Sequence, residues 1–372
     1  MKLKWSLPEI IVFAVAALLP TYLIRFHVGP VPMTVLEIVE LAAIVALIAK
    51  FQVSSFRFQL GRNRLLAIGS ALLIIATVIG IIVAPDTRAA LGIAKAYFWE
   101  PMLLAWLLVA ARPDKEKMFR AFALGAAVST AVVIGYAFIQ FSHPSRIPAP
   151  WDAERRITSV FPYPNATALY LAPIAPLLLS LPWGWVLGLL ALMTTVLARS
   201  VGGLLAGGAA LVAAGAADEK KRTRTIFLAV AALSVGLLAL RTPVIQKQIA
   251  QKQWSARVRD IGYHETFAML RDHPLFGAGI SGFPIVVKPY HRATAIEIFQ
   301  YPHNLFLTIW SELGLIGLAG FVCIIVWFFK KRDNWMLNAA MLAILLHGLI
   351  DVPYFKNDLA MFFWLLIVMV AL

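Results

Sequence analysis

Apolar segments long enough to cross a membrane follow one another along almost the whole chain of 372 residues. Hydrophobic residues make up 61% of the sequence, charged residues only 14%, and the mean hydropathy is +0.81. Soluble globular domains carry about 25% charged residues. Twelve spans of about 20 residues each would leave room for only short connections and one or two modest loops. We therefore predict a single all-α, polytopic membrane domain over residues 1–372.

Hydropathy divides this domain into twelve segments separated by polar connections. The spans are expected near residues 7–24, 32–50, 65–84, 91–111, 120–141, 165–181, 184–198, 201–217, 225–240, 304–329, 335–350 and 358–372. Basic residues gather at positions 2–4 and in alternate connections, near residues 50–64, 112–120, 220–224 and 330–332. Because cytoplasmic connections are enriched in Lys and Arg, we expect both termini in the cytoplasm.

Two connections then lie on the external side, a short loop at residues 142–164 and a long loop at residues 241–303. The long loop holds more basic than acidic side chains, which suits either lipid phosphates or an anionic substrate group. Arginine binds phosphate well because its planar guanidinium donates two parallel hydrogen bonds. We attribute the formal net charge of +14 to membrane orientation, lipids and an anionic ligand, and we expect no nucleic-acid partner.

The segment from Tyr301 to Gly317 carries a specific motif. His303 and Asn304 are followed by nine residues and then by Gly314-x-x-Gly317. This pattern resembles the signature of the bacterial O-antigen ligase and O-antigen polymerase superfamily, and it is closer to the ligase form.

Three further stretches resemble the same superfamily in the expected order. They are residues 161–170, which contain Asn165; residues 198–203, which contain Arg199; and residues 259–283, a helix and turn that begin with Arg259. The resemblance covers roughly residues 160–330.

The resemblance implies a GT-C-like helical fold and a glycosyltransferase of the bacterial inner membrane. Such an enzyme moves a glycan from undecaprenyl pyrophosphate to a sugar hydroxyl of the lipid A core, at the periplasmic face and with inversion. It needs no nucleotide, metal or other cofactor. A polymerase that extends a lipid-linked glycan and a protein O-oligosaccharyltransferase remain alternatives.

Residue roles follow from the resemblance and from side-chain chemistry. His303 is the expected base, because imidazole titrates near neutral pH. Arg199 and Arg259 are expected to bind the pyrophosphate, with Arg257 as the alternative to Arg259. Asn304 and Asn165 are expected to support the site, and Asn304 equally fits a helix cap.

Other classes of protein fit the sequence less well. Carboxylates inside or beside predicted spans are Glu37, Glu40, Glu100, Glu312 and Asp351, and His347 lies four residues before Asp351. Such groups also suit a proton-coupled transporter or flippase, but that class leaves the basic loop and the His303 motif unexplained. A metal-dependent transferase would need paired carboxylates, for which Asp152 and Glu154 are the candidates. Arg155 and Arg156 follow directly, so ion pairs within the loop are the simpler interpretation.

Overall fold

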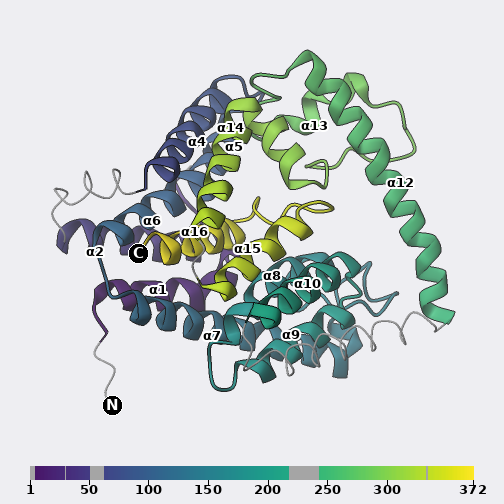
Figure 1. Cartoon of the computed structure of the whole chain (residues 1–372). Helices are drawn as coiled ribbons and strands as arrows, with labels where there is room; N and C mark the ends of the chain where they lie inside the picture. The colour runs from purple at the N-terminus through teal and green to yellow at the C-terminus, as the bar shows by residue number, and fades with distance from the viewer. Residues whose placement is uncertain (1–4, 30, 51–62, 218–242, 332–333) are drawn as a thin grey trace.

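The computed structural model describes residues 5–29, 31–50, 63–217, 243–331 and 334–372, and these residues are mostly helical (Figure 1). The first part of the chain forms α1 (Leu7–Leu18), η1 (Leu19–Leu23), β1 (Arg25–Val28), β2 (Val31–Thr34), α2 (Val35–Lys50), α4 (Arg64–Ile82), α5 (Thr87–Ile93), the π-helix η3 (Ala94–Trp99), α6 (Glu100–Ala110), α7 (Lys115–Ser142) and η4 (Pro144–Arg146). The second part forms α8 (Pro164–Leu178), α9 (Gly184–Leu197), α10 (Val201–Ala217), α12 (Pro243–Asp272), α13 (Phe283–Val286), η5 (Lys288–Tyr290), α14 (Leu305–Lys330), α15 (Trp335–His347) and α16 (Asn357–Ala371).

The chain is a mainly α-helical membrane protein. Within the described residues, four helical stretches are long and apolar enough to cross a membrane: Arg64–Ile82, Thr87–Ala110, Lys115–Ser142 and Leu305–Lys330. Five shorter apolar helices accompany them. Helices lie at every predicted span except residues 225–240, which fall outside the described residues. The number of twelve spans and the GT-C-like fold stay predictions.

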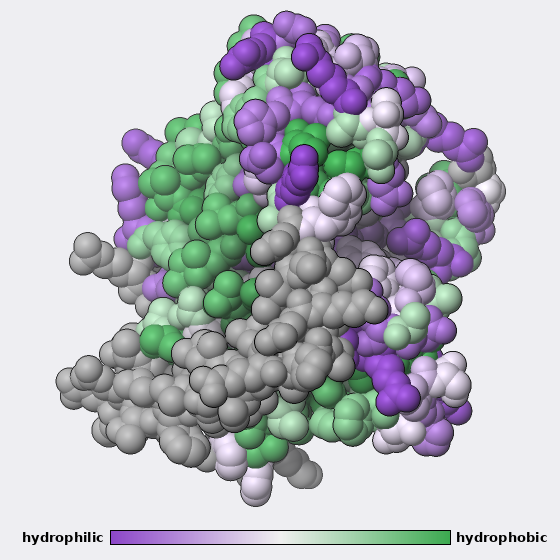
Figure 2. Space-filling model, turned by 90° about the vertical axis from the view of Figure 1, so that its right-hand side faces the viewer, coloured by the Kyte–Doolittle hydropathy of each residue, from purple (hydrophilic) through white to green (hydrophobic). Residues whose placement is uncertain are grey.

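Helix α16 lies at the centre of the bundle. All its residues from Asn357 to Ala371 are buried, which fits a helix that is apolar around its whole circumference. Outside it, α4 packs along α14, α1 along α7, and α8 against α9, α10 and α15 (Figure 1). The face that contains α12 carries hydrophilic side chains at its upper and right-hand edges, beside an apolar surface (Figure 2).

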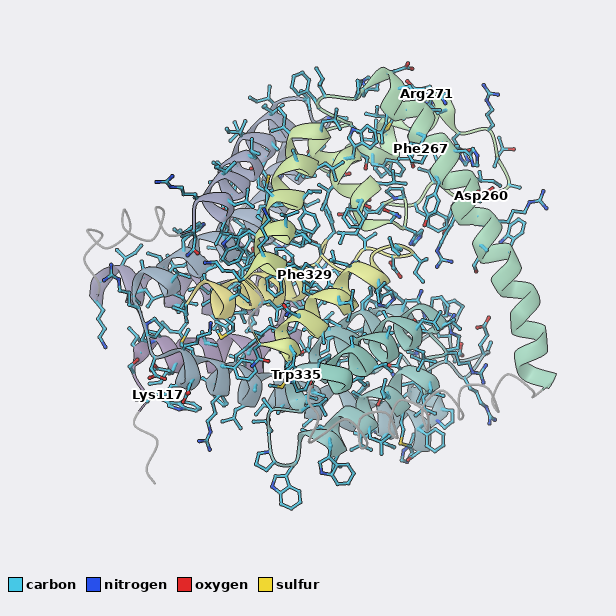
Figure 3. The ribbon with its side chains drawn as sticks, viewed as in Figure 1. Lys117, Asp260, Phe267, Arg271, Phe329 and Trp335 are labelled. Carbon is cyan, nitrogen blue, oxygen red and sulfur yellow. The ribbon has the colours of Figure 1, made fainter. Side chains whose placement is uncertain are left out.

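Two local features differ from the sequence-based prediction. The second span begins at Val35 instead of residue 32, because residues 31–34 form β2 and pair with β1 in an antiparallel hairpin. Gly29 supplies the left-handed turn between the strands, with φ of 58°. In the long connection 241–303, the helix expected from Arg259 begins much earlier, since the 30-residue helix α12 starts at Pro243. This helix runs along one side of the molecule and carries Asp260, Phe267 and Arg271 (Figure 3).

Helix α14 is kinked at Gly314, the first glycine of the Gly-x-x-Gly motif. Gly314 has φ of 66° and ψ of −172°, which removes it from the helical conformation. The turn before α13 occupies the opening: the Leu315 N–H donates to the Leu275 carbonyl at 3.1 Å, and the Ala278 N–H donates to the Ser311 carbonyl at 2.6 Å. The glycine therefore joins the α12–α13 region to α14 by backbone hydrogen bonds.

We expect Gly314→Ala to destabilise the protein by about 2 kcal/mol or more, because alanine is strained at this φ and has no space. Its Cβ would lie 1.9 Å from the Leu275 carbonyl oxygen. Gly135→Ala in α7 is the matched control, since a Cβ there meets nothing within 4 Å. Thermal unfolding in detergent measures both variants. Equal stability of the two variants would contradict this role of Gly314.

Candidate active site

One cavity of about 600 Å³ collects most of the residues singled out in the sequence. Its walls come from the segment before α8, the start of α10, one face of α12, the residues before α14 and the turn after α15. Arg199, Arg259, His303 and Asn165 all line it. These residues are far apart in the sequence, so the fold brings together side chains that only a motif comparison had connected.

Arg199 lies at the junction of α9 and α10 in a strained backbone conformation. Its φ is 55°, in the left-handed region. The Arg199 N–H donates to the Val196 carbonyl, and the Ser200 N–H donates to the Thr195 carbonyl. This pair of bonds is the Schellman motif that ends many helices, and its left-handed position is usually glycine. A left-handed non-glycine residue costs about 1–3 kcal/mol, which makes Arg199 a candidate for a functional side chain.

The start of α10 adds a second feature that favours an anion. The Ser200 hydroxyl accepts a hydrogen bond from the Gly203 N–H at 3.4 Å, and Ser200, Val201 and Gly202 line the cavity. The first N–H groups of a helix have no partner within the helix and carry partial positive charge. The terminus of α10 is thus suited to bind a phosphate group beside Arg199.

Arg156 also lines the cavity, although its sequence context predicted only ion pairs within its own loop. Its ion pair with Glu154 exists, at 3.8 Å, but its Nε also donates to the Ala198 carbonyl at 3.3 Å. The guanidinium also donates to the Asn165 side-chain oxygen at 3.4 Å. Burial lowers the pKa of Arg156, Glu154 opposes this effect, and the nearby charge of Arg199 adds to it. Two guanidinium groups therefore lie close enough to repel each other, which an anion between them would relieve.

Helix α12 contributes Arg259. Trp254, Ser255, Val258 and Arg259 recur at helical spacing and face the cavity together. The Arg259 Nε is buried and has no hydrogen-bond partner among the described residues. Arg257 is exposed and is not among the cavity residues. Of the two arginines considered in the sequence, only Arg259 lies where a ligand in this cavity would touch it.

His303 sits directly before α14 with a left-handed φ of 51°. The Asn304 side chain caps the helix by accepting hydrogen bonds from the Phe306 and Leu307 N–H groups at 3.0 and 3.1 Å. The Tyr263 hydroxyl donates to the His303 carbonyl at 3.1 Å. The His303 ring packs edge-to-face with the Phe299 ring, and the two ring centroids lie 4.8 Å apart. Asn304 thus acts as a cap that fixes the position of His303.

Asp351 is the partner of His303. Its Oδ1 lies 3.7 Å from His303 Nδ1, which is an ion-pair distance, and both side chains face the cavity. Burial favours a raised pKa for the Asp351 carboxyl, but the neighbouring His303, with His347 and the Val352 N–H, outweighs it and lowers this pKa. Asp351 is therefore an anion at neutral pH, placed to orient the His303 imidazole.

His347, Asp351 and Arg156 are the residues that the sequence analysis missed as site residues. The spacing of four between His347 and Asp351 was visible, but it was connected with a transporter. Nothing in the sequence links Asp351 to His303, since the pairing depends on how α14 and α15 pack.

The carboxylates in or beside the predicted spans other than Asp351, namely Glu37, Glu40, Glu100 and Glu312, do not line this cavity. Glu312 accepts a hydrogen bond from the Ser281 N–H, so it fastens α14 to the preceding turn. Glu37 and Glu100 form ion pairs with Lys95 at 2.6 and 3.8 Å. Glu37, Glu100 and Glu312 therefore each have a structural partner.

The comparison with protein families identifies the central part of the chain. Residues 186–322 match the family model described as O-antigen ligase. This part of the chain is similar to the O-antigen ligase family. The matched range includes Arg199, Arg259, His303 and both motif glycines. It excludes Arg156, Asn165 and Asp351, which complete the cavity from outside it. A search of the curated proteins found no match.

We expect Arg199→Gly to raise the stability of the protein by about 1 kcal/mol, because glycine adopts the left-handed conformation without steric cost. Arg199→Ala keeps the Cβ and should give no such gain. Thermal unfolding of both variants in detergent tests the assignment. If Arg199→Gly were less stable than Arg199→Ala, the side chain would be holding the fold together and not serving a ligand.

Asp351→Asn should reduce stability most at neutral pH. Because the folded-state pKa of Asp351 is lowered, its charge adds stability above the ordinary value of about 4. This contribution is lost as the pH falls through the folded-state pKa. The difference in melting temperature between wild type and Asp351→Asn should therefore shrink below about pH 4. A difference that stays constant from pH 7 to the acid range would contradict the ionised pairing with His303.

Proposed function

We propose that this protein is an O-antigen ligase. It transfers a glycan from undecaprenyl pyrophosphate to a sugar hydroxyl of the lipid A core, with inversion and without metal or nucleotide. The observation that carries the proposal is the single cavity in which Arg156, Arg199 and Arg259 surround a space that His303 and Asp351 also reach. Glycosyl transfer needs both functions, charge neutralisation of the leaving group and a base for the acceptor.

The arginines are suited to the leaving pyrophosphate. Three guanidinium groups and the start of α10 provide fixed donors for an anion, and the partnerless Arg259 Nε leaves one donor free for it. Donors of this kind stabilise the charge that develops as the bond from C1 to the pyrophosphate oxygen breaks. This arrangement supports a mechanism in which arginine side chains, in place of a metal ion, neutralise the charge of the leaving pyrophosphate.

His303 is suited to the acceptor. The acceptor oxygen forms its bond to C1 while its proton moves to His303, and the pyrophosphate leaves with the bonding electron pair. Asp351 stabilises the imidazolium that results, as a carboxylate does in other imidazole-based sites. The reaction is one displacement at C1, and atoms and charge balance without a further reactant.

The membrane setting follows the charge pattern of the sequence. We propose that the protein lies in the bacterial inner membrane with both termini in the cytoplasm and the cavity open to the periplasm. Nucleotides are scarce on that side, so the energy of transfer comes from the donor's own pyrophosphate bond. The polyprenyl chain would lie among the membrane lipids beside the apolar helices.

Purified protein with the polyprenyl-pyrophosphate glycan, lipid A core and EDTA, but no nucleotide, should form product. His303→Ala should fold and lose about 10² to 10⁴ in rate, because the base is gone. Arg259→Ala should lose roughly 30-fold, equivalent to about 2 kcal/mol, whereas its matched control Arg257→Ala should keep wild-type activity.

The same assay separates the alternatives. Chain extension with added lipid-linked repeat units, but no transfer to core, would make the protein a polymerase. Absence of product in both reactions, or wild-type rates for His303→Ala, would overturn the proposal.

A further inference from the structure

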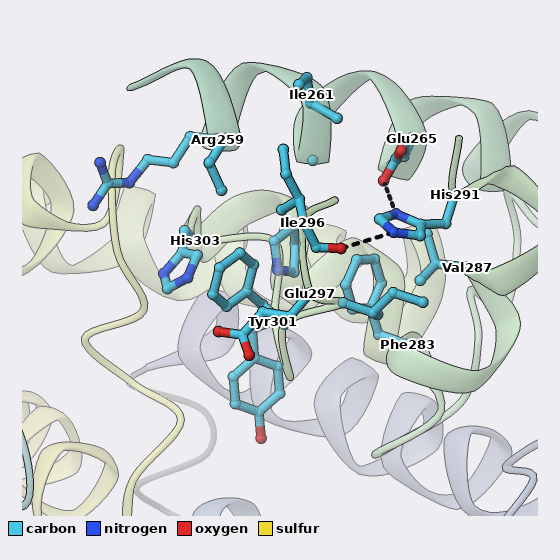
Figure 4. A pocket seen from close by; sticks show the side chains of 15 residues that line it. Arg259, Ile261, Glu265, Phe283, Val287, His291, Ile296, Glu297, Tyr301 and His303 are labelled. Carbon is cyan, nitrogen blue, oxygen red and sulfur yellow. Dashed lines mark hydrogen bonds and ion pairs between the residues drawn. The ribbon is translucent and has the colours of Figure 1, made fainter. Parts of the chain in front are cut away.

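A second, smaller pocket adjoins the cavity on the other side of His303 (Figure 4). The two share Val258, Arg259, Phe299 and His303 in their walls. The second pocket then extends along α12 and the segment before α14. His303 therefore stands at the boundary between two separate spaces, and its imidazole can serve groups in both.

The two spaces differ in charge. The large cavity is lined by three arginines together with Glu154 and Asp351, whereas the small pocket shares Arg259 and adds two carboxylates, Glu265 and Glu297. The Glu265 carboxylate already has two partners: His291 Nδ1 lies 2.9 Å from its Oε2, and the Arg292 N–H donates to its Oε1 at 3.0 Å. Glu297 is exposed at the rim of the pocket, and it has no hydrogen-bond or ion-pair partner within the described part of the chain. Figure 4 shows the side chains of Glu297 and His303 on the same side of the pocket, away from the Glu265–His291 pair.

The geometry of displacement requires two such spaces. The acceptor oxygen must approach C1 from the side opposite to the leaving pyrophosphate, so a base serving the acceptor has to lie between the donor site and the acceptor site. With pyrophosphate among the arginines, the acceptor belongs on the side of the small pocket.

The small pocket also restricts what can enter it. Its volume of about 30 Å³ admits one or two groups the size of a water molecule, such as a hydroxyl or hydroxymethyl, and not a whole sugar ring. An ionised carboxylate accepts hydrogen bonds from hydroxyl groups and repels phosphate.

We propose that this pocket is the acceptor subsite: it receives the hydroxyl-bearing edge of an uncharged sugar, and Glu297 accepts hydrogen bonds from that sugar. The inference rests on the glycosyl transfer proposed above. It adds that the acceptor sugar carries no phosphate next to the reacting hydroxyl, and that Glu297 determines this specificity.

The test is a kinetic comparison of wild type, Glu297→Gln, Glu297→Ala and the control Asp260→Asn. Asp260 is an exposed carboxylate on α12 that lines neither space. Core oligosaccharides with and without phosphate groups serve as acceptors. Wild type should prefer the phosphate-free acceptor by about 10-fold or more. Glu297→Ala should raise the KM for this acceptor by about 10-fold while leaving the KM for the donor unchanged.

Glu297→Gln should lose much of the discrimination against the phosphorylated acceptor, because it removes the charge but keeps the shape. Asp260→Asn should behave as wild type, and equal melting temperatures would show that all variants are folded. Unchanged acceptor KM and unchanged discrimination in both Glu297 variants would overturn the acceptor subsite while leaving the transfer reaction intact. Absence of transfer by wild type would remove both proposals.

Discussion

The start of α14 is fastened to the turn after α15, and the arrangement of the cavity depends on this attachment. The Leu305 N–H donates to the Gly348 carbonyl at 2.7 Å, and the Asn304 side chain donates to the Leu349 carbonyl at 3.0 Å. From α12, the Tyr263 hydroxyl reaches the same Leu349 carbonyl at 3.2 Å. Three segments distant in sequence are therefore held within hydrogen-bonding reach of one another, and the imidazole and its carboxylate partner face each other as a result.

The strained backbone conformations at the site persist because hydrogen bonds to neighbouring segments hold them in place. Arg199 and His303 both adopt left-handed conformations, Arg199 after the end of α9 and His303 before the start of α14. Hydrogen bonds on both sides determine each conformation, and the kink at Gly314 lets the turn before α13 support α14 from outside. The buried Arg259 Nε, which has no hydrogen-bond partner among the described residues, lies at the wall between the two spaces. Polar atoms left in this way are normally satisfied by a ligand or water.

The sequence predicted the helices that the structure describes and the motif residues that line the cavity, whereas the roles of those residues stay predictions. Hydropathy predicted the helical segments because long apolar runs are their main signal, and the motifs predicted Arg199, Arg259 and His303. Arg156 and Asp351 could not be predicted, since their proximity to the site comes from packing between distant segments. The β1–β2 hairpin was missed because four-residue strands give a weak pattern, and the kink at Gly314 because a glycine in an apolar helix equally fits close packing.

The central claim is that the pyrophosphate of a lipid-linked glycan binds between the arginines with its C1 toward His303. An experimental structure of the protein with bound undecaprenyl-pyrophosphate glycan in nanodiscs tests it most directly. We expect the diphosphate to contact Arg199, Arg259 and the first residues of α10, and the first sugar to lie beside His303. A diphosphate bound elsewhere, with the cavity filled only by water, would contradict it.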